Sequence, residues 1–174
     1  QYGNIVGALA TSYKVGTNAA GKETWTLKLR DTNWVRNDTG AVYGKVKAQD
    51  FVTGLKYVLN AKNGSATVGI PMEVIDGAAA YYKATAGAAD AAAAAQVDFA
   101  GVGVKAIDDN TVEFTLAAST PYFLSMLPYS PFLPVSEAWL QEKGSDFGNT
   151  ENDILVCGAY RITEHTANTK MVYD

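Results

Sequence analysis

Hydrophobic and polar positions alternate near the start of the chain and then change to a helical period. Residues 25–30 alternate strictly between apolar and polar side chains, which predicts a half-buried strand. Residues 8–15 are the candidate partner strand, with the stretch 16–21 as the turn between them. Residues 31–44 are polar and contain Asn and Gly, so we expect a loop there.

Three later segments have the spacing or the composition of helices. In residues 48–60 the apolar side chains return to one face, which predicts an amphipathic helix that Asn63-Gly64-Ser65 stops. That face carries Phe51, Val52, Leu55, Val58 and Leu59. Residues 73–84 predict a second helix. Its buried side holds Val74, Ala78, Tyr81 and Tyr82. The alanine-rich residues 88–95 favour helix but bury little surface, so they form either a lightly packed surface helix or a loop.

Two β-hairpins are predicted in the second half of the chain. Residues 102–107 and 111–116 flank the polar turn Asp108-Asp109-Asn110, and this arrangement is typical of a hairpin. Residues 160–164 and 169–173 have the same pattern around another polar turn. Together with the strands near the start, they indicate a small mixed or antiparallel sheet with helices packed on it, an α+β fold.

An uncharged run, TPYFLSMLPYSPFLPV at residues 120–135, contains four of the five prolines. It is shorter than the ~20 residues that a membrane-spanning helix needs, and its prolines would break a helix repeatedly. We therefore expect a short helix at residues 122–127, followed by an irregular apolar strip packed on a core. Ser136 then caps a helix to about Lys143, which Gly144 ends. Its inward residues are Trp139 and Leu140.

Composition bounds the class of protein. The 174 residues are 48% hydrophobic and 18% charged, which indicates a globular chain of one domain or one and a half. The net charge of −4 and the lack of a basic run argue against nucleic-acid binding, because phosphate recognition needs clustered Lys and Arg. The sequence shows neither a signal peptide nor a transmembrane span. It begins with Gln1 and not with Met, so we expect a piece of a longer protein.

Signals of catalysis or metal binding are weak. His165 is the one histidine, at a predicted strand end, and we interpret it as solvated or packed and not as catalytic. Cys157 is the one cysteine, so no internal disulfide forms, and we expect a buried thiol that acts as a small hydrophobe. The pair Asp108-Asp109 is better explained by turn chemistry than by a metal. We therefore predict no enzyme activity, cofactor or metal.

The order of segments adds a resemblance. Residues 102–116 read VGVKAIDDNTVEFTL, which is similar almost letter for letter to a hairpin motif of the solute-binding proteins of oligopeptide ABC importers. Other segments resemble the same family: GALATSYKV at 7–15, WTLKLRD at 25–31, GKVKAQDFV at 44–52, TPYFL at 120–124 and ILVCGAY at 154–160. The chain departs from the family pattern at residues 31–44 and at Cys157, where the family commonly has Asn.

This resemblance implies a sub-domain of a periplasmic-binding-protein-like (type II) fold. Residues 1–157 would form the extra sub-domain of the first lobe, and residues 158–174 the strands that return toward the main lobe, with the second lobe outside the chain. The apolar run 120–135 would be the packing seam of that lobe. The residues nearest a ligand would be Val68, Ile70, Met72, Gly158 and Tyr160.

The implied parent is a receptor on the extracellular face of the cell membrane or in the periplasm. It would capture oligopeptides, deliver them to the permease subunits of an ABC importer, and touch the membrane only through a lipid anchor outside this chain. Two alternatives stay open. The parent could bind another solute, such as a metal chelate, haem or a sugar, or the tyrosine-rich surface could serve adhesion or docking of a partner.

Overall fold

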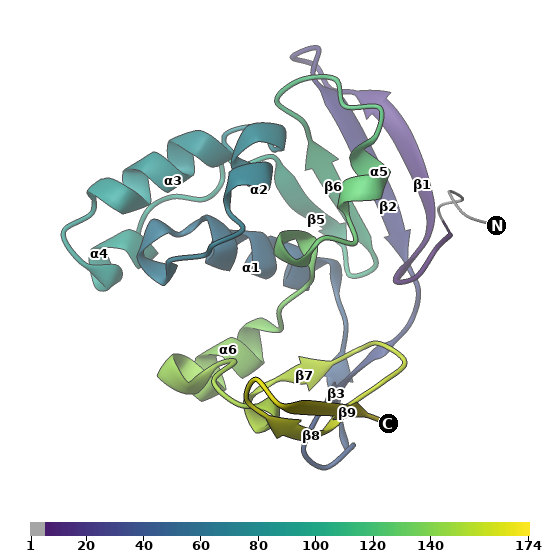
Figure 1. The fold of residues 1–174 in the computed structure, drawn as a ribbon. Coiled ribbons are helices and arrows are strands. Elements are labelled where there is room, and N and C mark those ends of the chain that lie inside the picture. Colours follow the sequence, from purple (N-terminus) through teal and green to yellow (C-terminus); the bar gives the residue numbers. More distant parts are fainter. Residues whose placement is uncertain (1–5) are drawn as a thin grey trace. The chain divides into compact units, whose positions relative to one another are not determined.

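The computed structural model describes residues 6–174, which fall into two compact units (Figure 1). The first unit contains the chain up to Arg30 together with Lys47–Pro134, and the second contains Asp31–Val46 together with Val135–Asp174. The chain therefore leaves the first unit, returns to it, and ends in the second. The division at residue 157 that the resemblance implies concerns the lobes of a longer protein and stays a prediction.

A four-stranded antiparallel sheet forms one layer of the first unit. Its strand order is β1-β2-β6-β5. The strands are β1 (Ala10–Thr17), β2 (Glu23–Leu29), β5 (Val104–Asp108) and β6 (Thr111–Thr115). The predicted strand pair near the start and the predicted hairpin at 102–116 are both confirmed. The Asp108 carboxylate accepts hydrogen bonds from the Asn110 amide and the Thr111 hydroxyl, at 2.7 and 2.8 Å, which is the turn chemistry expected there.

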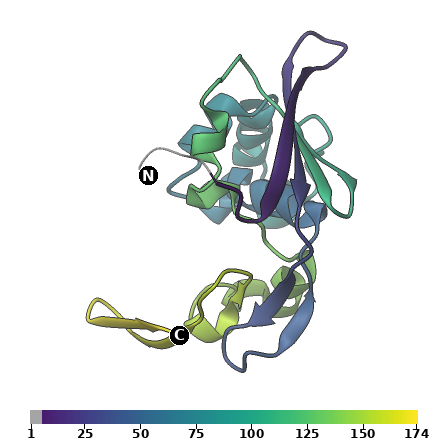
Figure 2. The same ribbon diagram turned by 90° about the vertical axis from the view of Figure 1, so that its right-hand side faces the viewer.

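Alternation gives this sheet one apolar and one polar face. Trp25 pairs with Phe114, and Leu27 pairs with Val112; all four side chains are buried. On the other face the Thr26 hydroxyl donates to Glu113 at 3.1 Å. Figure 2 views the sheet nearly edge on and shows the helices of this unit on one side only. The apolar face is therefore the floor of the core.

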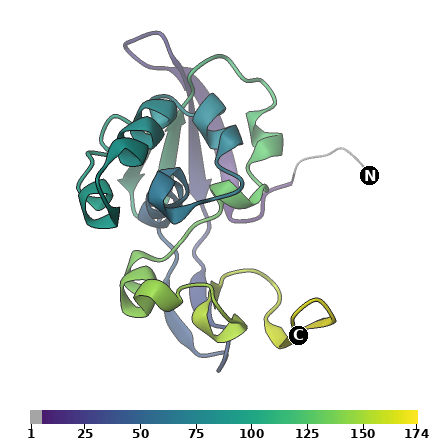
Figure 3. The ribbon, with the colours of Figure 1, turned by 60° about the vertical axis from the view of Figure 1, so that its left-hand side comes forward.

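Helices and short turns cover the apolar face (Figure 3). They are α1 (Ala48–Leu59), η1 (Ala61–Asn63), α2 (Gly69–Val74), α3 (Ala78–Gly87), α4 (Ala91–Ala95), α5 (Phe123–Met126) and η2 (Ser130–Phe132). In α1, Leu55 and Leu59 are fully buried, and Phe51 and Val52 pack at the margin of the core. Phe123 of α5 contacts the rings of Trp25, Phe114 and Phe132, so the start of the apolar run enters the core as expected.

The single helix predicted for residues 73–84 is wrong, because the chain breaks it between α2 and α3. Ile75 forms a β-bridge with Leu116, and the Asp76 amide donates to the Thr115 carbonyl at 3.0 Å. Gly77 has a φ of 71°, and a Cβ there would collide with the carbonyl oxygen of Gly101. Attachment to the sheet edge thus overrides helix propensity. The alanine-rich stretch forms α4, in which Ala94 alone is buried.

Glu23 fixes the segment that leads into α5. Its carboxylate accepts hydrogen bonds from the Trp25 indole at 2.7 Å, the Ser119 hydroxyl at 2.6 Å and the Thr120 amide at 3.3 Å. These hydrogen bonds, that of Ser119 first, lower the pKa of the Glu23 carboxyl. The carboxylate therefore holds the α5 segment close to β2.

The second unit is built on a three-stranded antiparallel sheet. Its strand order is β4-β3-β7, and a separate hairpin joins β8 to β9. The bounds are β3 (Asn33–Arg36), β4 (Val42–Lys45), α6 (Glu137–Lys143), η3 (Gly144–Asp146), η4 (Glu151–Asp153), β7 (Leu155–Val156), β8 (Ile162–Thr166) and β9 (Lys170–Tyr173). The predicted hairpin at 160–173 and the predicted helix after Ser136 are confirmed. The Ser136 hydroxyl accepts a hydrogen bond from the Trp139 amide, and Gly144 is the C-cap.

The loop predicted for residues 31–44 is wrong, because these residues form the hairpin of β3 and β4. Gly40, with a φ of 72°, and Asp38, whose carboxylate accepts from the Thr39 amide at 2.7 Å, supply the turn. Trp34 is the buried anchor of β3. With four residues in each strand, the alternation is too short to stand out from the polar residues around it.

Trp139 is the centre of the second unit. Its indole N–H donates to the Asp153 carbonyl at 2.9 Å, and the Tyr43 ring meets it edge-on at 5.1 Å. The Lys143 ammonium and the Arg36 guanidinium lie 4.8 and 5.4 Å from its ring centre. One aromatic ring therefore contacts β3, β4, α6 and η4.

Replacing Tyr81 by Phe separates ring packing from the hydroxyl. The ring is buried edge-on against Phe99, and its oxygen has no hydrogen-bond partner in the described residues. We expect Tyr81→Phe to leave the free energy of unfolding unchanged or to raise it by about 1 kcal/mol. Tyr81→Ala should lower it by about 3–5 kcal/mol. Denaturant titration measures both free energies. A clear decrease in Tyr81→Phe would show that the hydroxyl has a stabilising partner, against the structure.

Asp153 gives the second unit an acid-sensitive contact. Its carboxylate accepts from the Lys143 ammonium at 2.8 Å and from the Thr150 hydroxyl at 2.7 Å, and the hydrogen bond from Lys143 is the main cause of its lowered pKa. A carboxyl whose pKa is lowered by folding stabilises the fold above its ordinary value of 3.8, and this contribution disappears as the pH falls through the lowered native value.

We therefore expect Asp153→Asn to lower the thermal midpoint of unfolding at pH 7. In a series from pH 7 to pH 2, the midpoints of the variant and of the parent chain should become equal at the acid end. Tryptophan fluorescence follows the transition. The exposed Asp146, on η3 of the same unit, supplies the matched control as Asp146→Asn. An equal difference between parent and Asp153→Asn at every pH would count against the proposed role.

Candidate functional site

The five site residues predicted from the resemblance lie in two groups, one in each unit. Val68, Ile70 and Met72 belong to the first unit, where Val68 is the N-cap of α2 and the other two lie on that helix. Val68 and Met72 are half-buried against the core, while Ile70 is exposed at the surface. Ile70 is therefore the member of this group whose side chain is available to a ligand.

Gly158 and Tyr160 lie in the second unit, on the bend between β7 and β8. The Tyr160 ring is 68% exposed, and a Cβ built on Gly158 would meet open space. Before the bend, Val156 pairs with Val35 of β3. After it, Arg161 exchanges two backbone hydrogen bonds with Asp174, at 2.8 and 2.9 Å. The bend thus presents an amphipathic aromatic side chain from a support fixed at both ends.

Asn37 is the support that sequence reasoning missed. Its side-chain amide donates to the carbonyls of Glu151 and Ile162, both at 2.8 Å, and its oxygen accepts from the Ile162 amide at 2.8 Å. The residue is 3% exposed. An Asn that matches three backbone groups in this way ties the β3–β4 turn to η4 and to the start of β8. The sequence places it in a predicted loop, within an Asn-Asp-Thr triplet that matches a glycosylation pattern common by chance.

Arg161 adds a second link beside Asn37. Its guanidinium donates to the Asn37 carbonyl at 3.3 Å, and a Cβ built on Gly40 would come within 2.9 Å of it. Gly40 therefore leaves room for this side chain as well as adopting the left-handed turn. The residue after Tyr160 is in this way fastened to the hairpin of β3 and β4.

Among the described residues, His165 and Cys157 are the one histidine and the one cysteine, side chains that could act as a base, a nucleophile or a metal ligand. His165 Nδ1 lies 3.7 Å from a Glu151 carboxylate oxygen, and the ring is partly exposed. Cys157 is half-buried, where the sequence predicted a buried thiol. Within residues 6–174 no group of three or more His, Cys, Asp and Glu is arranged to hold a metal ion. In the same residues no helix combines the length and hydropathy of a membrane span.

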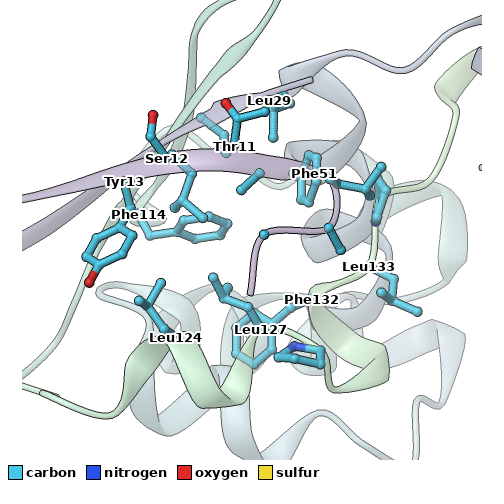
Figure 4. Close-up of a pocket in the computed structure, with 18 of the residues that line it drawn as sticks. Thr11, Ser12, Tyr13, Leu29, Phe51, Phe114, Leu124, Leu127, Phe132 and Leu133 are labelled. Atoms are coloured by element: carbon cyan, nitrogen blue, oxygen red, sulfur yellow. The ribbon is translucent and has the colours of Figure 1, made fainter. Parts of the chain in front are cut away.

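An apolar groove of about 520 Å³ lies within the first unit, between β1 and the segment of α5 and η2 (Figure 4). It is lined by Val6–Tyr13, Leu27, Leu29, Phe51, Val112, Phe114, Leu124, Leu127, Pro128 and Phe132–Pro134. The sequence predicted that residues 120–135 pack on a core, and Phe123 and Phe132 do so. Leu124 and Leu127 also pack against this core, and together with Leu133 they line the groove, which the sequence did not predict.

Asn37→Ala tests the support of the Tyr160 bend. The change leaves buried backbone groups without partners, so we expect local opening of β8 to become easier by about 2–4 kcal/mol. Amide hydrogen exchange across residues 162–166 measures it. Asn149→Ala, at an exposed Asn in the same unit, is the matched control and should leave exchange unchanged. Equal protection in both variants would show that Asn37 does not hold the bend.

Comparison with known proteins shows what this architecture resembles. The family of bacterial extracellular solute-binding proteins, family 5 (middle region), matches residues 4–174. The oligopeptide-binding protein AmiA of Streptococcus pneumoniae is 33% identical over 99% of the chain and 24% of its own length. The chain thus spans about a quarter of this curated relative.

Solved structures agree on the fold. The oligopeptide-binding protein OppAIV of Borrelia burgdorferi superposes with a TM-score of 0.74 at 25% identity, over 95% of this chain and 29% of its own. The murein tripeptide binding protein MppA of Escherichia coli gives 0.74 at 28% identity, over 98% and 30%. These matches confirm the predicted α+β class and the periplasmic-binding-protein-like fold.

The family match also bears out two coarser expectations. Its members are solute-binding proteins, in agreement with the prediction that the chain is not an enzyme. The family is described as extracellular, which agrees with a location outside the cytoplasmic membrane. The match covers both units, from residue 4 to the last residue. The chain belongs to the bacterial extracellular solute-binding proteins of family 5.

Proposed function

We propose that these residues are part of a receptor that captures oligopeptides and delivers them to an ABC importer. The observation that carries the proposal is 33% identity to an oligopeptide-binding protein over 99% of the chain. Relatives that match almost the whole chain are named for oligopeptides, which favours a peptide over a metal chelate, haem or a sugar. Because the chain spans about a quarter of those relatives, the activity is that of the longer protein.

The peptide would be held mainly through its backbone. An extended ligand that pairs with main-chain groups gains affinity without depending on its side chains, which suits a receptor for many sequences. Closing of two lobes around the ligand would shift an existing equilibrium between open and closed forms. The permease subunits of the importer would then distinguish the closed form.

Two of the five predicted contacts are the better placed. Ile70 and Tyr160 expose apolar surface from fixed positions, on a helix and on a braced bend. Val68 and Met72 are packed on the core of the first unit and would act by holding α2 in place. Gly158, where an added Cβ would meet no atom within 4 Å, would let a ligand backbone approach the bend.

The location and attachment follow from the proposed role. The receptor would work on the extracellular face of the cell membrane or in the periplasm, where peptides arrive. A lipid anchor outside these 174 residues would keep it near the permease subunits. This arrangement raises the local concentration of loaded receptor at the importer.

The full-length receptor, incubated with a tryptic digest of casein and desalted, should carry peptides that native mass spectrometry identifies. One recovered peptide then serves for calorimetry. We expect Tyr160→Ala to weaken its Kd about tenfold, since an exposed aromatic anchor is lost. Tyr173→Ala, at another exposed tyrosine of the second unit, is the matched control.

The piece 1–174 should bind the same peptide weakly or not at all, because most contacts come from outside it. Binding by this piece as tight as that of the full receptor would overturn the proposed division of the site. Failure of the full receptor to retain any peptide would overturn the proposed ligand class.

A further inference from the structure

The apolar groove of the first unit is a place where the covering layer of the sheet is incomplete. Residues on one rung of the sheet share a face, and Val15, Trp25 and Phe114 form such a rung, as do Tyr13, Leu27 and Val112. Trp25 and Leu27 are each 5% exposed, whereas Tyr13 is 57% exposed. The layer that buries β2 and β6 therefore stops short of β1.

The groove has the character of a protein interior. None of its lining residues is charged, and Thr11, Ser12 and Tyr13 are the members with polar side chains. In Figure 4 the hydroxyls of Thr11 and Ser12 point up, away from Leu124 and Leu127 on the opposite wall. A small-molecule site usually offers a few convergent polar groups that orient the ligand. The surface of this groove is mostly apolar, which suits apolar side chains.

The walls of the groove are held in place and do not close on each other. Glu23 fastens the start of the α5 segment to β2, and the Phe123 ring is wedged among Trp25, Phe114 and Phe132. Collapse of the walls would have to displace these contacts. Leu133, half-exposed at the rim, and Tyr13 across the groove both keep apolar surface uncovered. A segment that covered both residues would therefore remove further apolar surface from water.

We propose that in the longer polypeptide this groove is filled by apolar side chains of the stretch that directly precedes residue 1. The relatives that match are about four times the length of this chain, so most of such a polypeptide lies outside the two units. Residues 6–9 already line the groove, so a preceding stretch would be tethered at its edge. A tether of a few residues gives an effective concentration on the order of millimolar, and intramolecular docking prevails over free ligands.

Protection of the groove is the first measurement, made on the full-length receptor without added peptide. In a Cys157→Ser background, Leu133→Cys reports on the groove. Ile107→Cys on β5, outside the groove and of similar exposure, is its control: the two side chains are 50% and 56% exposed here. We expect maleimide to modify position 133 about 100-fold more slowly than position 107, because a covered site reacts only on local opening. Equal rates would show that the groove is open and would overturn the proposal.

The identity of the occupant is the second measurement. A photo-reactive benzoylphenylalanine placed at Leu133 should cross-link within one molecule to a peptide from before residue 1, which mass spectrometry of the digest identifies. Cross-links to a second copy, to a segment after residue 174, or to an added amphiphile such as dodecyl maltoside would each overturn it. Both measurements are independent of peptide binding, so a receptor for another solute would give the same result.

Discussion

The sheet of the first unit has one apolar face, and the need to cover that face determines how the rest of the unit is arranged. Trp25, Leu27, Val112 and Phe114 form its centre and are removed from water by α1, α5 and η2. Each such side chain contributes roughly 1.5–3 kcal/mol when fully buried, so the apolar face outweighs any single polar contact. The break between α2 and α3 follows from the same constraint, since Ile75 leaves the helix to join the sheet through Leu116.

The second unit is stabilised in a different way. Its sheet has three short strands, and Trp139 gathers two cations, an aromatic ring and a carbonyl around one indole. Asn37 then joins segments that no strand pairing connects. Each of these polar contacts depends on all its partners, because a buried group left without one is costly. The bend with Tyr160 takes its position from this network.

Strict alternation was the reliable guide in the sequence. Trp25–Leu29 of β2 and Thr111–Thr115 of β6 lie in strands because enough apolar positions repeat to mark a buried face. The hairpin of β3 and β4 could not be predicted in this way, since β3 has a single buried residue, Trp34, and one residue makes no alternating pattern. Helix propensity also failed at Ile75 to Gly77, where the bridge to Leu116 and the close approach to Gly101 decide the backbone.

Of the candidate site, sequence could supply the residues but not their surroundings. The resemblance singles out Tyr160, while the side chain that supports its bend, Asn37, is distant in sequence, and its Asn-Asp-Thr triplet gives no sign of this packing. Residues 120–135 show a similar limit. Their composition predicts burial, but hydropathy does not say that Leu124 and Leu127 pack on the core of the first unit while Leu133 stays half-exposed.

The bonds of Asn37 to Ile162 span 125 positions of the chain. When synthesis has passed Pro134, all residues of the first unit have been made. The hairpin of β3 and β4 still lacks residues 135–174, with which it packs in the second unit. Domains fold as they emerge, the earlier-finished ones first. The first unit would thus fold on the nascent polypeptide while β3 and β4 are still unpacked. A truncation after Pro134 would therefore unfold the second unit and leave the first folded.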